Sequence, residues 1–375
     1  MPNVVLPRTR GGTQTVATLI PVTEPDMTLS PSLHQRLGIE LPILQAPMAG
    51  AQDSALAIAV SRAGGLGALP CAMLSLEAMG EELAAFRAAT STPLNVNFFC
   101  HVPPEPDSGV QARWHKALAP FFAEFGLDID AVTQGPGRRP FDHQACEVLE
   151  PFRPEVVSFH FGLPDAVLLE RVKAWGATVL STATTVEEAR WLEAQGADAL
   201  IVQGLEAGGH RGMFLSEEIT TQMGTLALLP QVRDAVDLPL IAAGGIADAS
   251  GVAAARALGA DALQIGTALL CCPETTISAI HRRALQSEAA RHTALTNLYS
   301  GRPARGIVTR LMRELGPMAE VAPAFPLATS AIAPLRAAAE ATGSGDFSPL
   351  WAGQNASRCR PIPAADVIAE LAVGM

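Results

Sequence analysis

The chain has 375 residues, of which 49% are hydrophobic and 17% charged, so it can bury a large core and is not expected to be disordered. Its formal net charge of −11 argues against a nucleic-acid partner, which requires a basic surface. Its apolar runs are shorter than the roughly 20 residues of a membrane span, so we expect no membrane partner either.

Residues 1–30 lack the hydrophobic segment and cleavage site of a signal peptide. We expect them to form an N-terminal extension, flexible or draped over the surface, of a cytoplasmic protein. The 6 cysteines form no C-x-x-C pair and fall in no zinc-ligand spacing. We therefore expect buried, reduced thiols and no metal site.

From residue 40 onward, short apolar runs alternate with longer amphipathic stretches. Helical patterns lie between most of the runs, for example at 53–63, 164–175, 186–195 and 249–258. Repeated strand–helix units predict a parallel sheet, and eight of them match an α/β fold of the (β/α)8 or TIM-barrel type. The expected strands are 43–48, 65–70, 94–99, 156–161, 178–183, 199–203, 239–243 and 262–266.

Three segments depart from a plain barrel. We expect the barrel domain to span 31–270, with a helical insertion at 101–154 between its third and fourth strands. The segment 271–375 is expected to be a mainly helical lid subdomain that returns to the barrel near 350–375. The third departure is the extension at 1–30.

The fourth strand carries polar residues with a period of two. Ser158 and His160 share one face, whereas Val157, Phe159 and Phe161 share the other, which suits packing against the outer helices. His160 would then lie at the mouth of the barrel, where TIM-barrel enzymes place their chemistry. This position favours a catalytic role, with a hydrogen-bonded structural histidine as the alternative.

Glycine-rich loops follow several strands. After the run at 199–202 come Gln203 and four glycines within residues 204–212, whose N–H groups can form a nest for an anion. Asn97, near the end of its strand, is expected to reach a ligand. Gly245 and the pair Gly266-Thr267 end the seventh and eighth strands, where barrels often bind phosphate. Together they predict a cofactor that carries a phosphate.

Several other barrel chemistries are excluded by missing residues. The only lysines, Lys116 and Lys173, fall outside the strand ends, which argues against Schiff-base chemistry. The chain has no H-x-H pair, and no carboxylate closes a predicted strand, which argues against metal-dependent hydrolases and glycosidases. A Rossmann glycine motif is absent after the first strand. A phosphate-bearing cofactor with its own reactivity remains, and FMN fits that description.

An ordered set of motifs resembles the nitronate monooxygenase family, formerly called 2-nitropropane dioxygenases. The resemblance covers roughly residues 38–360. Its motifs are QAPMAG at 45–50, GGLG at 64–67, NVNF at 95–98, VSFHFG at 157–162, VQGLEAGGHRG at 202–212, AGGI at 243–246, QIGT at 264–267, GRPARG at 301–306 and WAGQ at 351–354.

The resemblance implies a TIM barrel with a smaller lid and noncovalently bound FMN. His160 matches the active-site histidine of the family. His210 and Tyr299 are expected on the substrate side of the pocket, and Arg302 and Arg305 are expected to tie the lid to the barrel through ion pairs. The implied FMN contacts are Ala46, Pro47, Met48, Asn97, Gln203, Gly208, Gly209, Gly245, Gln264, Ile265, Gly266 and Thr267.

The reaction implied is the oxidation of alkyl nitronates, and of nitroalkanes as an option, by O2 to a carbonyl compound and nitrite. His160 would act either as a neutral base toward a nitroalkane or as an imidazolium that holds the nitronate. Two rival functions stay open: an NAD(P)H-dependent FMN enoyl or quinone reductase, and a noncatalytic flavin-binding protein. The oligomeric state is open as well, with a homodimer as one option.

Overall fold

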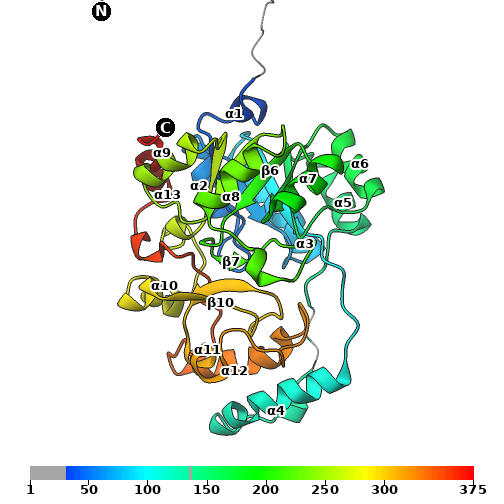
Figure 1. Ribbon diagram of the computed structural model, residues 1–375, viewed down its shortest axis with the longest axis vertical. Coiled ribbons are helices and arrows are strands. Elements are labelled where there is room, and N and C mark those ends of the chain that lie inside the picture. The colour runs from blue at the N-terminus through cyan, green and yellow to red at the C-terminus, as the bar shows by residue number, and fades with distance from the viewer. Residues whose placement is uncertain (1–30, 134, 136) are drawn as a thin grey trace, which may run out of the picture. The chain divides into compact units, whose positions relative to one another are not determined.

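The computed structural model describes residues 31–133, 135 and 137–375, and the predicted extension at 1–30 lies outside them. Residues Ser32–Met375 form one compact unit. Parallel strands follow one another around a barrel in the order β1-β9-β8-β6-β5-β4-β3-β2 (Figure 1). A parallel bridge between Leu44 and Leu66 joins β1 to the chain just before β2 and completes the ring. The strands are β1 (Ile43–Gln45), β2 (Gly67–Pro70), β3 (Leu94–Phe99), β4 (Val156–His160), β5 (Thr178–Ala183), β6 (Ala199–Gln203), β8 (Leu240–Ala243) and β9 (Ala262–Ile265).

The eight predicted strands and the TIM-barrel fold are therefore confirmed. Most outer helices begin at a residue whose side chain accepts a main-chain N–H, as Asp53, Asp165 and Asp248 do. The last helix packs against α2 and α9, so the chain ends on the barrel. The outer helices are α2 (Ser54–Arg62), α3 (Leu76–Ala89), α5 (His143–Leu149), α6 (Ala166–Ala174), α7 (Val186–Ala194), α8 (Thr225–Arg233), α9 (Ala249–Ala257) and α13 (Ala364–Ala372).

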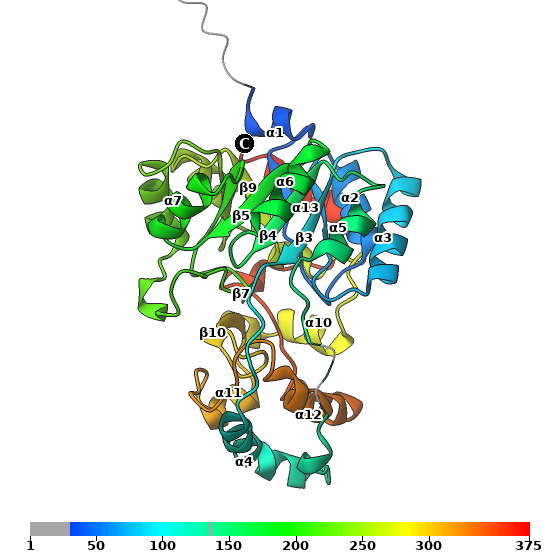
Figure 2. The ribbon, with the colours of Figure 1, turned by 90° about the vertical axis from the view of Figure 1, so that its right-hand side faces the viewer.

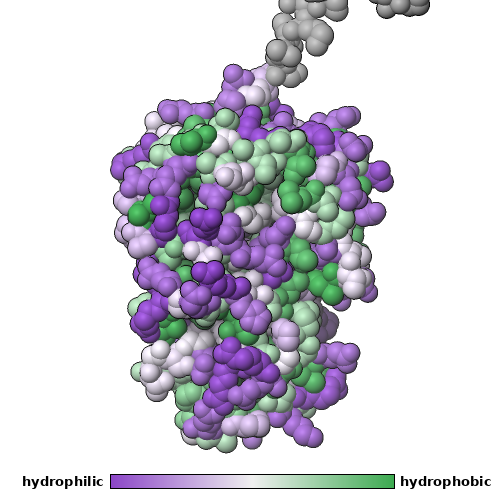
Figure 3. All heavy atoms as spheres, turned by 60° about the vertical axis from the view of Figure 1, so that its left-hand side comes forward, coloured by the Kyte–Doolittle hydropathy of each residue, from purple (hydrophilic) through white to green (hydrophobic). Residues whose placement is uncertain are grey.

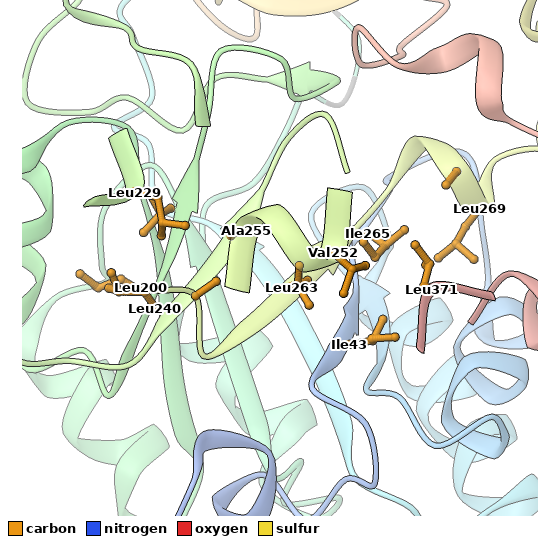
Figure 4. Close-up of a cluster of buried hydrophobic side chains, with 14 of the residues drawn as sticks. Ile43, Leu200, Leu229, Leu240, Val252, Ala255, Leu263, Ile265, Leu269 and Leu371 are labelled. Atoms are coloured by element: carbon orange, nitrogen blue, oxygen red, sulfur yellow. The ribbon is translucent and has the colours of Figure 1, made fainter. Parts of the chain in front are cut away.

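Two layers of buried side chains hold the barrel together. Between strands and helices, Leu200 and Leu240 meet Leu229 of α8, and Leu263 meets Val252 of α9 (Figure 4). Inside the barrel, the alternate residues of the strands form a second cluster, which Leu33 and Leu37 of the α1 region (α1, Leu33–Arg36) extend. Burial of these side chains is the main driving force for the fold.

Phe161 does not follow the predicted alternation. Val157 and Phe159 pack among the outer helices as expected, but Phe161 joins Phe99 and Phe325 in a separate aromatic cluster. The reason is that β4 ends at His160, and the next residue has a left-handed backbone with φ of +70°. A bulky side chain rarely adopts this conformation, so the turn after His160 is strained.

The other helices and strands form a second layer beyond the mouth of the barrel, within residues 32–375 (Figures 1 and 2). Helix α4 of the insertion packs against α12, and Trp114, Phe122 and Ile332 share one core. The insertion at 101–154 and the C-terminal segment, which sequence reasoning treated separately, are thus packed together. These elements are α4 (Ser108–Glu124), α10 (Ala279–Leu285), α11 (Arg310–Leu315), α12 (Thr329–Ala341), β10 (Thr293–Thr296) and β11 (Ala304–Ile307).

A small antiparallel sheet was not predicted. Its order is β10-β11-β7, and β7 is the dipeptide Gly209–His210 from the glycine-rich loop after β6. The second layer is therefore hydrogen-bonded to a loop of the barrel. The 3-10 turns are η1 (Ile129–Ala131), η2 (Ile219–Thr221), η3 (Thr267–Leu269), η4 (Glu288–Arg291) and η5 (Ala356–Arg358).

The surface mixes polar and apolar residues on the face shown in Figure 3. Large exposed hydrophobic side chains lie on separate elements, such as Val167 on α6, Leu226 on α8 and Val373 after α13. Single exposed apolar residues are ordinary on a protein surface. None of the helices in the described part of the chain has the length and apolar character needed to cross a membrane.

Candidate active site

A cavity of about 290 Å³ lies where the parallel strands end. The loops after β1, β6, β8 and β9 line it, together with residues at the ends of β3, β4 and β5 and a segment at 348–355. This is the end of the barrel at which TIM-barrel enzymes bind their ligands. The predicted site residues that line the cavity are Ala46, Pro47, Met48, Asn97, His160, Gln203, Gly208, Gly209, His210, Gly245, Gln264, Gly266 and Thr267.

Two predicted residues lie outside the lining. The side chain of Ile265 is buried in the core between strands and helices, and its carbonyl accepts a hydrogen bond from the Ala46 N–H at 2.8 Å. Tyr299 is buried with its hydroxyl bonded to Thr309, and its ring lies edge-on to Trp351 with the centroids 5.6 Å apart. Trp351 itself lines the cavity, so Tyr299 lies behind the wall instead of on it.

Both ring nitrogens of His160 have protein partners. Nε2 lies 3.2 Å from the His210 carbonyl oxygen, and Nδ1 lies 3.0 Å from Oγ1 of Thr182. Because a carbonyl oxygen only accepts, Nε2 carries the hydrogen, and Nδ1 of the neutral ring accepts from the Thr182 hydroxyl. Burial, together with the nearby charges of Arg302 and Arg211, lowers the pKa of His160 to about 3. His160 is therefore neutral near pH 7.

His210, on β7, faces the same cavity as His160. Its Nε2 lies 2.8 Å from Oγ of Ser300, which connects the glycine-rich loop to the second layer. Burial lowers its pKa to about 3, with His160 and Arg138 among the charges that add to the shift. His160 and His210 are thus both neutral at neutral pH, and so is His281 on the same lining, because burial lowers its pKa to about 4.

Gln203 holds the glycine-rich loop in shape. Its Oε1 accepts from the Gly212 N–H at 2.8 Å, and its Nε2 donates to the His210 carbonyl at 3.0 Å. A Cβ at Gly212 would lie 2.9 Å from Cε1 of His160 and 2.5 Å from Cγ2 of Thr182. Glycine at this position therefore allows the loop to approach the imidazole closely.

Beneath this loop lies Arg211, whose side chain is fully buried. It donates to the carbonyls of Gly204 at 2.6 Å and Gln203 at 2.8 Å, and to Oε1 of Gln222 at 3.0 Å. Burial, with the charge of Arg305, lowers its pKa to about 9, so it stays protonated at neutral pH. A buried cation with three acceptors braces the start of the loop.

We expect Arg211→Lys to lower the free energy of unfolding by about 2 kcal/mol, because a single ammonium cannot reach all three acceptors in the same geometry. Urea unfolding followed by circular dichroism measures the change. Arg190→Lys, at an exposed site on α7, is the matched control. Equal losses in the two variants would show that Arg211 does not brace the loop.

The opposite side of the cavity is built from the loops after β8 and β9. The Gly353 N–H donates to Oγ1 of Thr267 at 2.9 Å, and Nδ2 of Asn355 donates to the Gly245 carbonyl at 3.0 Å. A Cβ at Gly208 would lie 2.5 Å from the Gly353 nitrogen, so main chain packs on main chain here. The segment at 353–355 therefore closes the two loops that were predicted to bind phosphate.

Two polar side chains keep hydrogen-bonding capacity toward the cavity. Oε1 of Gln264 is buried and has no partner among the described residues. Nδ2 of Asn97 donates to Oγ of Ser158 at 2.9 Å and to its carbonyl at 3.2 Å, which leaves the amide oxygen for another donor. Buried polar atoms normally have partners, so these two residues indicate a polar ligand.

Arg302 and Arg305 connect the two layers, but not through ion pairs as predicted. Arg305 donates to the Leu205 carbonyl at 2.9 Å, and Arg302 donates to the Met213 carbonyl. The guanidinium of Arg302 also lies 4.0 Å from the ring centroid of Phe161. Main-chain carbonyls turned toward the second layer supply the acceptors, which sequence spacing does not reveal.

Other residues of the cavity lining were not singled out from the sequence, among them Phe99, Arg138 and Thr182. The two-residue period could have identified Thr182, because it shares a strand face with the buried interior residue Leu180. Phe99 ends β3 and belongs to the aromatic cluster with Phe161. Arg138 lies in the insertion, where no strand or helix period applies.

Comparison with known proteins gives consistent matches along the chain. A family model described as nitronate monooxygenase matches residues 30–374. Proteins called nitronate monooxygenase from Paraburkholderia phytofirmans and Pseudomonas aeruginosa are each 42% identical to this chain. The alignments cover 92% and 89% of this chain, and 95% and 96% of those two proteins.

Solved structures show the same likeness. A nitroalkane oxidase from Streptomyces ansochromogenes matches with a TM-score of 0.81 and 42% identity, over 89% of this chain and 95% of that one. FabK from Thermotoga maritima matches less well, with a TM-score of 0.67 and 26% identity over 92% of this chain and 95% of that one. The chain is thus similar in sequence and in fold to one group of enzymes along nearly its whole length.

Proposed function

This chain belongs to the nitronate monooxygenase family of flavin-dependent enzymes, and we propose that it uses FMN and O2 to oxidise alkyl nitronates to carbonyl compounds and nitrite. The observation that supports this best is a neutral imidazole, His160, held at two points on the wall of a glycine-lined cavity. The small-molecule substrate and O2 would meet in that cavity.

The residues around the cavity fit FMN. The unpartnered Oε1 of Gln264 and the free amide oxygen of Asn97 suit the polar groups of the cofactor. Glycines whose Cβ would collide with neighbouring main chain, such as Gly208, suit a cradle for its phosphate end. We propose that FMN is held by Ala46, Pro47, Met48, Asn97, Gln203, Gly208, Gly209, Gly245, Gln264, Gly266 and Thr267, with Ile265 supporting Ala46 from behind.

When bound, FMN supplies the electron-accepting ring that the oxidation requires. The protein positions the substrate and sets the protonation state of His160. Since His160 is neutral at working pH, it cannot hold a nitronate by charge, which leaves the base as its better role. A proton would arrive at Nδ1 when the Thr182 hydroxyl turns to accept instead of donate. The imidazolium would then have acceptors at both nitrogens, Thr182 Oγ1 and the His210 carbonyl.

The low pKa of His160 also limits what this base can do. A group with a pKa of about 3 takes a proton from carbon reluctantly, so a nitronate that is already ionised is the better substrate. We therefore place alkyl nitronates ahead of neutral nitroalkanes as substrates.

An anaerobic mixing experiment tests the proposal. The purified protein, loaded with FMN, is mixed without O2 with ethylnitronate, and separately with NADH and with NADPH. We expect the visible absorbance of the flavin to change rapidly with ethylnitronate and to stay unchanged with either nicotinamide. Free FMN at the same concentration is the control.

Other results would favour the rival functions. Rapid bleaching by NADH or NADPH would favour the FMN enoyl or quinone reductase, the function for which the likeness to FabK gives some support. A yellow protein that none of the three compounds reduces would favour a noncatalytic flavin-binding protein. A colourless protein that does not take up FMN would refute the cofactor assignment.

A further inference from the structure

The proposed substrate is an anion, and none of the three histidines that line the cavity, His160, His210 and His281, supplies a positive charge. Most arginines near the cavity are engaged elsewhere. Arg211, Arg302 and Arg305 donate to main-chain carbonyls of the barrel loops. Arg336 lines the cavity, but it is paired with Glu340 at 2.7 Å.

Arg138 differs from these arginines. It lines the cavity, and the hydrogen bond that its guanidinium makes among the described residues goes to the carbonyl of its neighbour Gly137, at a long 3.3 Å. Burial lowers its pKa, but an arginine still carries its charge at neutral pH. A half-buried cation without a carboxylate at hand is costly unless a ligand compensates it.

Its surroundings suit a small anion. The charge of Arg138 is close enough to His210 and His101 to lower the pKa of both histidines. His101 is only 5% exposed; its ring nitrogens make no hydrogen bond of standard geometry among the described residues, but the main chain of Arg138 lies close enough to raise its pKa. Its ring stands edge-on to Phe325, with centroids 4.8 Å apart. Arg138 lines the cavity whereas His101 does not, so a ligand in the cavity would meet the guanidinium.

The phosphate of a flavin does not explain Arg138. The proposed phosphate cradle is built from the loops after β6, β8 and β9, whereas Arg138 comes after β3. In the barrel, β4 and β5 separate β3 from β6 on one side, and β2 and β1 separate it from β9 on the other. We propose that Arg138 is the cation that recognises the anionic nitronate group of the substrate. The nature of the anion rests on the proposed function, whereas the anion site does not.

The test uses nitrate as an unreactive planar anion, titrated into the FMN-loaded protein and followed through the visible spectrum of the flavin. We expect Arg138→Met to weaken nitrate binding by about tenfold or more, with the FMN content unchanged. Arg138→Lys, which keeps the charge, should recover part of the affinity. In steady-state assays, Arg138→Met should raise KM for ethylnitronate by a similar factor and change kcat much less.

The adjacent Arg139 offers a matched control. Its guanidinium donates to Asp142 at 2.6 Å and Gln144 at 2.8 Å, and its side chain is 60% exposed. Arg139→Met should bind nitrate as the unchanged protein does. Equal nitrate affinity in Arg138→Met and Arg139→Met, absent nitrate binding in the unchanged protein, or loss of FMN from Arg138→Met would each overturn the inference. If nitrate binding depends on Arg138 while ethylnitronate is not oxidised, the anion site stands and the proposed function falls.

Discussion

Replacing His160 with asparagine is expected to lower kcat/KM for neutral nitroethane by about 100-fold or more, the usual contribution of a general base. Oxidation of ethylnitronate, which needs no deprotonation, should fall by less than about tenfold. The amide of asparagine can take the place of Nδ1 beside Thr182, and the His210 carbonyl keeps its hydrogen bond from Nε2 of Gln203 at 3.0 Å, so the loop and the bound FMN should survive. Steady-state rates with both substrates, and the ratio of FMN to protein, measure these effects.

His143→Asn is the control for this prediction, because His143 is an exposed histidine at the start of α5 and does not line the cavity. It should leave both rates and the FMN content unchanged. Unaltered oxidation of nitroethane by His160→Asn would show that this imidazole is not the base, and would leave it a structural role in holding the loop after β6.

The parts of this molecule that sequence could predict depend on short-range periods. Strand alternation placed Ser158 inside the barrel and His160 at its mouth, and the structure has both there. Glycine-rich loops after β6, β8 and β9 were recognised because close approach of main chain requires residues without a Cβ, as at Gly208. In each case, a few neighbouring residues in the sequence are enough to predict the feature.

Features that depend on contacts between distant segments escaped prediction. The strand β7 has two residues and exists because Gly209 and His210 pair with β11, almost 100 positions later in the chain. The core shared by α4 and α12 joins Trp114 to Ile332. Neither contact produces a periodic pattern of apolar residues in the segments that take part in it.

Side-chain partners were equally hard to foresee. Arg302 and Arg305 were expected to form ion pairs, but they bind carbonyls that the turns of the barrel loops expose. Phe161 was assigned to the outer face by alternation, and a single left-handed residue after β4 redirected it. The backbone conformation of Phe161 itself, which the composition does not encode, determines where its side chain packs.

Acidification should destabilise this protein strongly between pH 6.5 and pH 4, because buried histidines resist protonation. Burial lowers the pKa of His160 and His210 to about 3 and that of His101 and His281 to about 4. In the unfolded chain each histidine would titrate near 6.5.

The folded and unfolded chains bind different numbers of protons, which sets the direction of the change in stability with pH. Below pH 6.5 the unfolded chain binds protons that the folded chain does not, so unfolding becomes more favourable as the pH falls, until the folded-state pKa is reached. Each of the four histidines contributes about 1.4 kcal/mol per pH unit within that window. We therefore expect the free energy of unfolding to fall by about 5 kcal/mol from pH 7.5 to pH 5.5, a large part of the stability of an ordinary domain.

Urea unfolding at the two pH values, at equal and saturating FMN, measures this loss as a lower midpoint at pH 5.5. His281→Gln isolates one of the four contributions: Nε2 of His281 donates to the Trp351 carbonyl at 3.1 Å, and glutamine can keep that bond without titrating. Its pH dependence should be about a quarter smaller, with His143→Gln as the exposed control. A midpoint that does not change between the two pH values would mean that these imidazoles are protonated in the folded protein. His160 could then hold a nitronate by its charge, and the base role argued above would lose its main support.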